Sequence, residues 1–409
     1  MQLGRAHPST LRAMFQLAAA RLANGDYSEA RDILETMTGH SDDYFQPGML
    51  RYRLELSRAY FLVGKTQRAR KLALHVAIHQ LQFDRPGTLM NGHFRNFRRA
   101  DCARDHVPVQ GALAYLAAKF KALVKAGSSF RVHPYFTTTL QHLATMAVRA
   151  QEEVPGEELG VLIGLIRDVK TLRNDKNIPQ DMADARLDYA LALLLKEMPA
   201  EEKDPLASAA ELLQSVMEWR KQELGGSHLD TIRAYRELMI VYSMRALSDL
   251  TQGRPVDISL QEVQVRSCSI LDSLESSLGS YHPETLQSRL WCFTVTLLIS
   301  SNQRGDDDKT KSSSTGQEIY DAAYTILARA RAPFVRQERY IEALKIEKTV
   351  FDLLLGAEII EPPLRNFLEH AQKDISETIE SENGTCAELE ELKISFRELW
   401  QLYQKSFSM

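Results

Sequence analysis

Apolar residues recur at intervals of three and four along nearly the whole chain, whereas runs that alternate apolar and polar residues between turn signals are missing. The first pattern places apolar side chains on one face of a helix, and the second is typical of a strand. The sequence therefore predicts an all-α protein. Candidate helices cover residues 9–24, 27–38, 48–63, 66–81, 108–125, 136–152, 157–173, 180–197, 205–223, 229–249, 260–277, 284–300, 317–331, 336–355, 362–381 and 386–405.

Two stretches interrupt this rhythm. Residues 83–108 combine arginines with Gly and Pro, which predicts a long loop with at most one short helix. Residues 301–318 are polar and Ser-rich with almost nothing to bury, which predicts disorder. We therefore expect a helical array over 1–301 that is irregular around 83–132, a disordered loop over 302–316, and C-terminal helices with an acidic cap over 317–409.

One short block recurs at the joints between predicted helices. Each of the three clear copies follows a Leu-Gly pair and consists of a histidine, then a proline or leucine, one further residue, and Thr-Leu or Thr-Ile. The copies are His7-Pro8-Ser9-Thr10-Leu11, His228-Leu229-Asp230-Thr231-Ile232 and His282-Pro283-Glu284-Thr285-Leu286, with a weaker copy at His133-Pro134. Gly can adopt the left-handed conformation that ends a helix, and Pro is well tolerated in the first turn of the next one. The block therefore predicts a stop, a turn and a restart.

A second pattern follows the joints. A small residue after a leucine (Ala18, Ser57) is followed by a glycine seven residues later and by an alanine five residues after that (Ala30, Ala69). Small side chains let the two helices of a hairpin approach closely, and the glycine makes the turn between them. The pattern predicts helix-turn-helix repeat units.

These blocks resemble tetratricopeptide (TPR) repeats, in particular the longer variety of kinesin light chains. Residues 3–37 match that motif nearly throughout, and 208–242 match the joint between two units. The chain departs from the motif at Leu229, which replaces the proline, at Cys292-Phe293, which replaces Leu-Ala, and over 83–132. The resemblance implies a right-handed α-solenoid that binds other proteins, and an N-terminal portion that precedes the first joint in longer relatives.

The resemblance also implies that certain side chains of each first helix face a concave groove. They are Arg12, Phe15 and Ala19; Arg51, Leu54 and Arg58; Arg233, Arg236 and Ile240; and Gln287, Leu290 and Thr294. Of these we expect eight to contact a partner: Arg12, Phe15, Arg51, Leu54, Arg58, Arg233, Arg236 and Gln287. Guanidinium groups pair with carboxylates bidentately, so an acidic or C-terminal peptide is the expected ligand. The alternative is that these arginines are exposed without a ligand, or bridge to acids such as Glu55 and Glu237.

Candidate chemistry is sparse. Phosphate-binding, nucleophile-elbow and metalloprotease motifs are absent, and we predict neither enzymatic activity nor a cofactor or metal. Asp306, Asp307 and Asp308 could attract a cation, but they fall in the polar loop. Residues 93–104 interleave arginine with phenylalanine, as nucleic-acid binders do, yet a solvated loop is the preferred interpretation. Because the joint histidines recur once per unit, we predict a structural role for them.

Composition narrows the class of protein. With 44% hydrophobic and 25% charged residues the chain has the balance of a soluble folded protein, and its net charge is −4. Basic residues are in excess over 1–104 and acidic ones over 357–409. Cys102, Cys268, Cys292 and Cys386 lie far apart without C-x-x-C spacing, which favours a reducing compartment. No signal peptide or membrane-spanning run is evident, so a cytoplasmic location is expected.

The sequence as a whole predicts a non-catalytic scaffold or adaptor that binds partner proteins, without nucleic acid or membrane. Two alternatives remain open at this point. The chain could be the self-associating regulatory arm of a signalling assembly, or an unrecognised all-α enzyme or accessory subunit of one.

Overall fold

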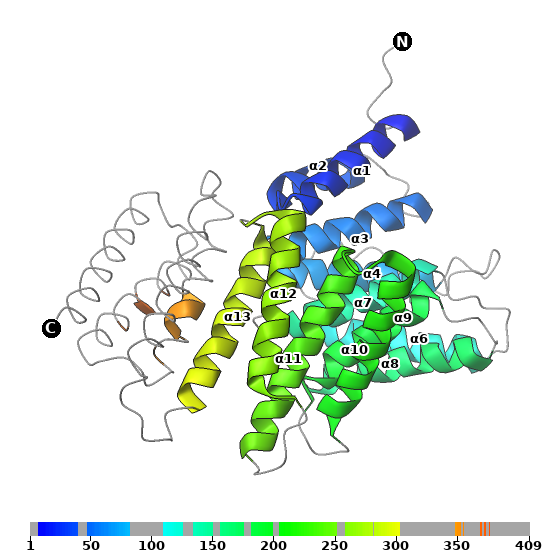
Figure 1. Cartoon of the computed structure of the whole chain (residues 1–409). Coiled ribbons are helices and arrows are strands. Elements are labelled where there is room, and N and C mark those ends of the chain that lie inside the picture. The colour runs from blue at the N-terminus through cyan, green and yellow to red at the C-terminus, as the bar shows by residue number, and fades with distance from the viewer. Residues whose placement is uncertain are drawn as a thin grey trace. The chain divides into compact units, whose positions relative to one another are not determined.

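The computed structural model describes residues 7–39, 47–81, 109–125, 134–149, 156–175, 181–198, 204–251, 258–280 and 282–302, with short helical stretches between 348 and 376 (Figure 1). Every element in these ranges is a helix, which confirms the all-α prediction. The chain divides into two compact units, Met1–Val241 and Tyr242–Met409.

The helices from α1 to α13 have bounds within a few residues of those predicted, and the predicted helices over 317–331, 336–355, 362–381 and 386–405 lie wholly or mostly outside the described residues. The first unit contains α1 (Pro8–Ala23), α2 (Tyr27–Gly39), α3 (Pro47–Leu62), α4 (Thr66–Gln80), α6 (Val109–Lys125), α7 (Pro134–Arg149), α8 (Gly156–Asp175), α9 (Met182–Leu195) and α10 (Pro205–Leu224). Helix α11 (Leu229–Thr251) begins in the first unit and ends in the second, which also contains α12 (Leu260–Leu278) and α13 (Pro283–Asn302).

Consecutive helices pack as pairs. Helix α1 packs on α2, α2 on α3, and α3 on α4, and the same succession joins α9 to α10 and α12 to α13 (Figure 1). The small residues predicted at the hairpin contacts, Ala18, Ala30, Ser57 and Ala69, are all fully buried. The Ser57 hydroxyl donates a hydrogen bond to the carbonyl of Ala69 at 2.7 Å, which ties α3 to α4. Stacked helix pairs of this kind are the packing of a TPR-like α-solenoid, the fold class predicted from the sequence.

The two hairpin turns have the same backbone. Gly25 and Gly64 adopt φ values of 77° and 82°, which residues with a Cβ rarely adopt. In each turn the residue after the glycine donates its N–H to a carbonyl five residues earlier, Asp26 to Arg21 and Lys65 to Tyr60, both at 2.8 Å. This bond satisfies a carbonyl that the helix end leaves open. The predicted role of the two glycines is therefore confirmed.

The middle of the first unit is arranged differently. Helix α6 packs against α4 and α8, whereas α7 packs on α4 and most extensively on α9. The Phe120 and Phe136 rings of α6 and α7 lie stacked, with centroids 6.1 Å apart, and both are fully buried. One large hydrophobic core cluster extends through the unit from Ala18 to Leu194. Helix α6 thus shares the core of the stacked pairs.

The predicted joints form as caps. The Nδ1 atoms of His7, His228 and His282 accept hydrogen bonds from the backbone N–H two residues later, each at 3.2 Å. Before them Gly225 and Gly279 adopt φ values of 93° and 86°, with extended ψ values of 156° and 160° rather than left-handed helical ones. A cap acceptor at the N-terminus satisfies an otherwise open N–H. The structural role expected of these three histidines is therefore confirmed.

Several predicted features lie outside the described residues. They are the stretch 93–104, His133, and the aspartates 306–308 with most of the predicted loop over 302–316. Asn302 itself is the last residue of α13. The proposed division at that loop stays a prediction.

Candidate functional site

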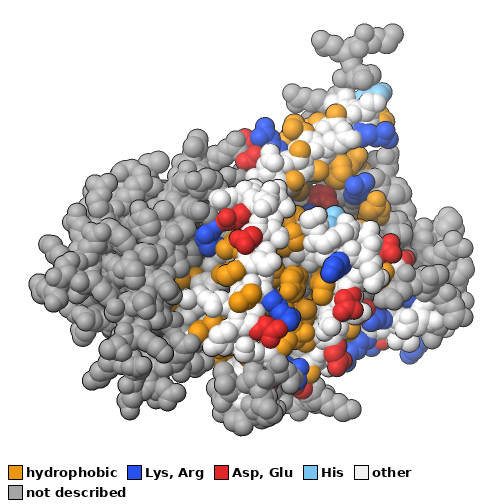
Figure 2. Space-filling model, viewed as in Figure 1, with side chains coloured by type: hydrophobic (Ala, Val, Ile, Leu, Met, Phe, Trp, Pro, Cys, Tyr) orange, Lys and Arg blue, Asp and Glu red, His pale blue; other side chains and the backbone are white. Residues whose placement is uncertain are grey.

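The first helices α1, α3 and α7 contribute one continuous set of aromatic and arginine side chains. The rings of Phe15 and Tyr52 lie 4.9 Å apart at an angle of 41°. The Arg51 guanidinium carbon lies 4.8 Å from the centre of the Phe15 ring and 6.0 Å from that of the Tyr135 ring. We call these four residues the arginine–aromatic face. Figure 2 shows hydrophobic and basic side chains side by side over α1 and α3.

The joints before α1 and α7 set where the helices that carry this face begin. His7 caps α1, and Pro8 and Pro134 stand at the first positions of α1 and α7. Arg51 lies in the second turn of α3, and its side chain reaches Phe15 on α1 and Tyr135 on α7. Arg51 therefore bridges two helices that the chain separates by more than a hundred residues.

Arg51 has the properties of a ligand-binding cation. Its side chain is exposed, and within the described part of the chain it makes no ion pair. A guanidinium over an aromatic ring is attracted by the ring face, and its N–H groups can still donate to a carboxylate. The two rings thus orient Arg51 without consuming its hydrogen-bond donors.

The other predicted residues of the first unit differ in accessibility. Arg12 is exposed on α1, three residues before Phe15 and so on the same side of the helix. Arg58 forms an ion pair with Glu55 at 3.8 Å but remains 43% exposed. Leu54 is buried against Leu50 and Val76, where no partner can reach it. The expected contact role is therefore wrong for Leu54, because it fills the space beneath the first helix.

The predicted residues of α11 and α13 do not join this face among the described contacts. Arg233 pairs with Asp230 at 2.9 Å, and Arg236 is buried beside Glu237 at 3.6 Å. Arg236 is a core residue, so it is unsuited to contact a partner, as the sequence-based alternative of bridging to Glu237 foresaw. Gln287 is exposed on α13, in the second unit.

Sequence reasoning missed Tyr52 and Tyr135. Tyr135, which is 38% exposed, lies in the first turn of α7, ahead of the positions that the repeat pattern assigns to the groove. Tyr52 directly follows Arg51, one place away from an assigned position. The signal available in the sequence was the aromatic residue after the His133-Pro134 joint, together with the Arg51-Tyr52 pair.

Elsewhere the polar groups of the described residues serve structure. Glu237 accepts hydrogen bonds from Arg149 and Lys196, both at 2.8 Å, and its side chain is only 3% exposed. Burial alone would raise the pKa of Glu237, yet the charges of Lys196, Arg149 and Arg236 hold it well below its usual range. A carboxylate held ionised among cations is a buried ion cluster, unsuited to act as a general acid.

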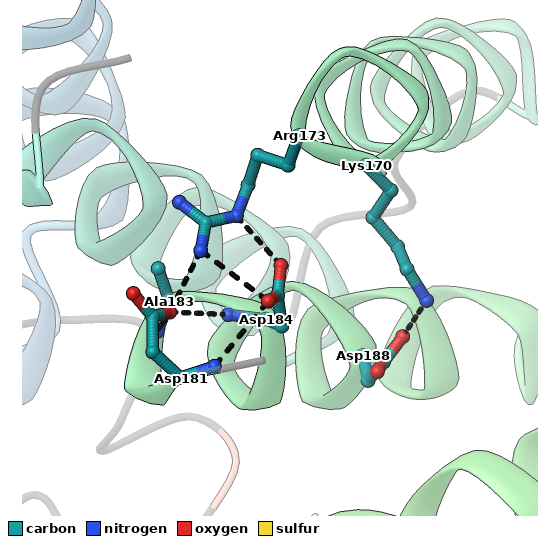
Figure 3. A network of polar contacts seen from close by, with 6 residues as sticks. All are labelled: Lys170, Arg173, Asp181, Ala183, Asp184 and Asp188. Atoms are coloured by element: carbon teal, nitrogen blue, oxygen red, sulfur yellow. Dashed lines mark hydrogen bonds and ion pairs between the residues drawn. The ribbon is translucent and has the colours of Figure 1, made fainter. Parts of the chain in front are cut away.

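A second cluster joins α8 to α9 (Figure 3). Arg173 donates to Asp184 at 2.6 Å and to Asp181 at 2.8 Å, and Lys170 pairs with Asp188. Asp181 also caps α9 by accepting the N–H of Ala183 at 2.7 Å. Each carboxylate here already has a cationic or backbone donor, so the cluster fixes the angle between two helices.

Ser57 and His142 lie 3.2 Å apart but do not form a nucleophile and base. The single hydroxyl proton of Ser57 is donated to Ala69, so the His142 Nε2–H must donate to the Ser57 oxygen. Burial, together with the charge of Arg58, lowers the pKa of His142 to about 3. The imidazole is therefore neutral and locked in one tautomer.

Neither metal nor membrane chemistry emerges from the described residues. Within those ranges, His, Cys, Asp and Glu side chains nowhere gather in a group of three or more that could hold a metal ion. The same part of the chain has no helix with the length and apolarity to cross a bilayer.

No match is found among protein-family models or among curated proteins. Among solved structures, the chain is similar to a Podosopora anserina putative kinesin light chain with nearly identical TPR-like repeats. The two are 18% identical, with a TM-score of 0.36, over 68% of this chain and 99% of that one. A circular tandem repeat protein with a novel repeat topology is 14% identical, with a TM-score of 0.28, over 97% and 91%. Both TM-scores are low, and the fold is assigned from the chain's own helix pairs: an all-α chain of stacked, TPR-like helical hairpins.

Proposed function

We propose that this chain is a non-catalytic protein-interaction scaffold that binds a partner peptide on the arginine–aromatic face. The observation that carries the proposal is the placement of Arg51, which is exposed, oriented by two aromatic rings and without a carboxylate partner among the described residues. Arg173, by contrast, is buried and paired with Asp181 and Asp184, as a structural arginine of the core is. Neither nucleic acid nor a membrane takes part in the proposed binding.

The chemistry of the face defines the ligand class. Arg51 favours a carboxylate ligand, either an acidic side chain or a C-terminus. Two further arginines lie on the helices of this face, Arg12 on α1 and Arg58 on α3. Phe15, Tyr52 and Tyr135 offer ring surface for an apolar or aromatic side chain next to that carboxylate. An extended acidic peptide with one large apolar residue meets both requirements.

Selection from a peptide library displayed with free C-termini, followed by titration of the selected peptides, tests the proposal. The full chain should enrich peptides that combine an acidic group with a large apolar residue. Charge reversal at Arg51 (Arg51→Glu) should weaken binding at least about tenfold, a difference of about 1.4 kcal/mol. Arg51→Lys should weaken it less, because charge remains while the planar guanidinium is lost.

Arg167→Glu is the matched control, because Arg167 is an exposed arginine on α8 away from the face. If Arg51→Glu and Arg167→Glu weakened peptide binding equally, the change in net charge would explain the loss, and the proposed site would be contradicted. Unchanged binding of the selected peptides by both Arg51→Glu and Tyr135→Ala would also overturn it. Circular dichroism of each variant shows whether the helices are retained.

The two alternatives drawn from the sequence are separated by direct measurements. Self-association would appear as a molecular mass that rises with protein concentration in sedimentation equilibrium. An enzymatic role would appear as specific binding of nucleotides or metal ions in a thermal-shift screen. The scaffold proposal expects neither response to depend on Arg51.

A further inference from the structure

The second unit brings together two cysteines that are distant in sequence. Helices α12 and α13 pack against each other, and they run antiparallel because only residues 279–282 connect them. The Gln264 side chain donates to the Thr296 hydroxyl at 2.9 Å, and Glu275 forms an ion pair with Arg289. These two contacts define the register of the helix pair.

Cys268 and Cys292 lie between those contacts. Cys268 comes four residues after Gln264 and Cys292 four residues before Thr296, which is about one helical turn along each helix. Antiparallel helices advance in opposite directions, so one turn from the Gln264–Thr296 contact the two cysteines stand opposite each other. Their thiols lie within hydrogen-bonding reach.

The two thiols have different environments. Cys268 is exposed, whereas Cys292 is buried, and both are free thiols. Burial, with the nearby Cys268 thiol, raises the pKa of Cys292 to about 12. A thiolate is far more nucleophilic than a thiol, so the buried sulfur reacts with a dissolved oxidant more slowly than an exposed one. Cys268 is the sulfur that a dissolved oxidant reaches.

We propose that Cys268 and Cys292 are an oxidative modification site, a dithiol that a peroxide converts to a disulfide between α12 and α13. The Cys268 sulfur attacks one peroxide oxygen and breaks the O–O bond, which leaves a sulfenic acid and one water molecule. The Cys292 sulfur then attacks the Cys268 sulfur and displaces the hydroxyl, which takes the thiol proton and leaves as a second water. The two thiols together lose two electrons, and the peroxide gains them.

The reaction is reversible by a dithiol reductant, through attack of a thiolate on the disulfide. In the reducing compartment that the sequence favours, the pair would therefore rest reduced and form the bond only under oxidant. This site belongs to the second unit and does not depend on the arginine–aromatic face.

The experiment uses the full chain with Cys102→Ser and Cys386→Ser, so that only the pair remains. Trypsin cuts after Arg266, Arg289 and Arg304, which places the two cysteines on separate peptides, 267–289 and 290–304. After treatment with hydrogen peroxide and alkylation of free thiols, mass spectrometry should find the two peptides linked, with two hydrogens lost, and separate again after dithiothreitol. In the Cys292→Ser variant, dimedone should label Cys268.

A matched control moves the exposed thiol by one residue. In Cys268→Ser with Ser269→Cys the new thiol is also on the exposed side of α12, but points about 100° away around the helix. This variant should give no linked peptide. If this variant formed the linked peptide as efficiently as the original pair, chance encounters of the two thiols would explain the disulfide, and the helix register would not be required. Recovery of both peptides unlinked from the folded, peroxide-treated chain would overturn the proposal outright.

Discussion

The guanidinium carbon of Arg51, on α3, lies 4.8 Å from the centre of the Phe15 ring on α1, and the same group lies 6.0 Å from the Tyr135 ring on α7. One side chain thus connects three first helices. A cation–π contact at an exposed site contributes about 0.5–1 kcal/mol. The contact therefore stabilises the fold only slightly, and its main effect is to orient the Arg51 guanidinium.

The coupling between Arg51 and Phe15 can be measured with a double-mutant cycle. Arg51→Ala, Phe15→Leu and the double variant should give an interaction free energy of about 0.5–1 kcal/mol in urea denaturation. Arg167 and Phe15 serve as the comparison pair and should be additive, because α8 packs on α6, α7 and α9 whereas α1 packs on α2. A coupling near zero for Arg51 and Phe15 would contradict the cation–π contact.

Glu237 should be the most sensitive charged residue of the first unit. Glu237→Gln removes the carboxylate that neutralises Lys196, Arg149 and Arg236, and leaves buried cations beside one another. Breaking a buried ion pair costs about 3–5 kcal/mol. Lys121→Gln, which breaks an exposed pair with Asp168, should cost less than about 1 kcal/mol in the same denaturation series. Similar losses for the two variants would argue against a buried cluster.

The joint glycines should tolerate no side chain. Gly279 has a φ of 86° with extended ψ, so Gly279→Ala should lower the free energy of unfolding by about 1–3 kcal/mol, although open space surrounds the position. Gly164 provides the opposite case. It lies inside α8 with nothing near its missing Cβ, so Gly164→Ala should stabilise by about 0.5–1 kcal/mol. Thermal denaturation of both variants checks the sign of each change.

The joint histidines should be replaceable by other caps. His228 is exposed and accepts the N–H of Asp230, so His228→Ala should cost about 1 kcal/mol. His228→Asn supplies a side-chain oxygen in the same place and should recover most of that loss. If both variants were equally destabilised, the histidine would be acting through packing instead of through its cap bond.

Acid should destabilise the fold through two half-buried histidines, His75 and His142. Burial, with the nearby charge of Arg53, lowers the pKa of His75 to about 4, and His142 has a pKa of about 3. The unfolded chain takes up these protons near pH 6.5, so stability is complete above that pH. It falls as the pH drops toward 4, by up to about 1.4 kcal/mol per pH unit for each histidine. His142→Gln should reduce the slope of unfolding free energy against pH, and an unchanged slope would refute the assignment.

Local rules were sufficient to predict the helices and their hairpins. The three-to-four residue period gives a helix wherever it occurs, and the bounds of α4, α10 and α12 follow from it almost to the residue. Gly25 and Gly64 could be assigned to turns because glycine, which has no Cβ, adopts a positive φ at little steric cost. His7 and His282 could be assigned to joints because a cap needs only its own next two residues.

The candidate site depended on distances between helices, which no local rule contains. The sequence identified Arg51 and Phe15, but the stacking order of α1, α3 and α7 added Tyr52 and Tyr135 and removed Leu54 and Arg236, whose side chains fill core positions. The Cys268–Cys292 pair was likewise not predictable from local rules, because its spacing in the sequence matches no motif. Only the antiparallel register of α12 and α13 brings the two sulfurs together. The sequence by itself thus determined where helices begin, turn and end, since those depend on neighbouring residues. Only the tertiary structure decided which side chains meet, since that depends on how separate helices pack.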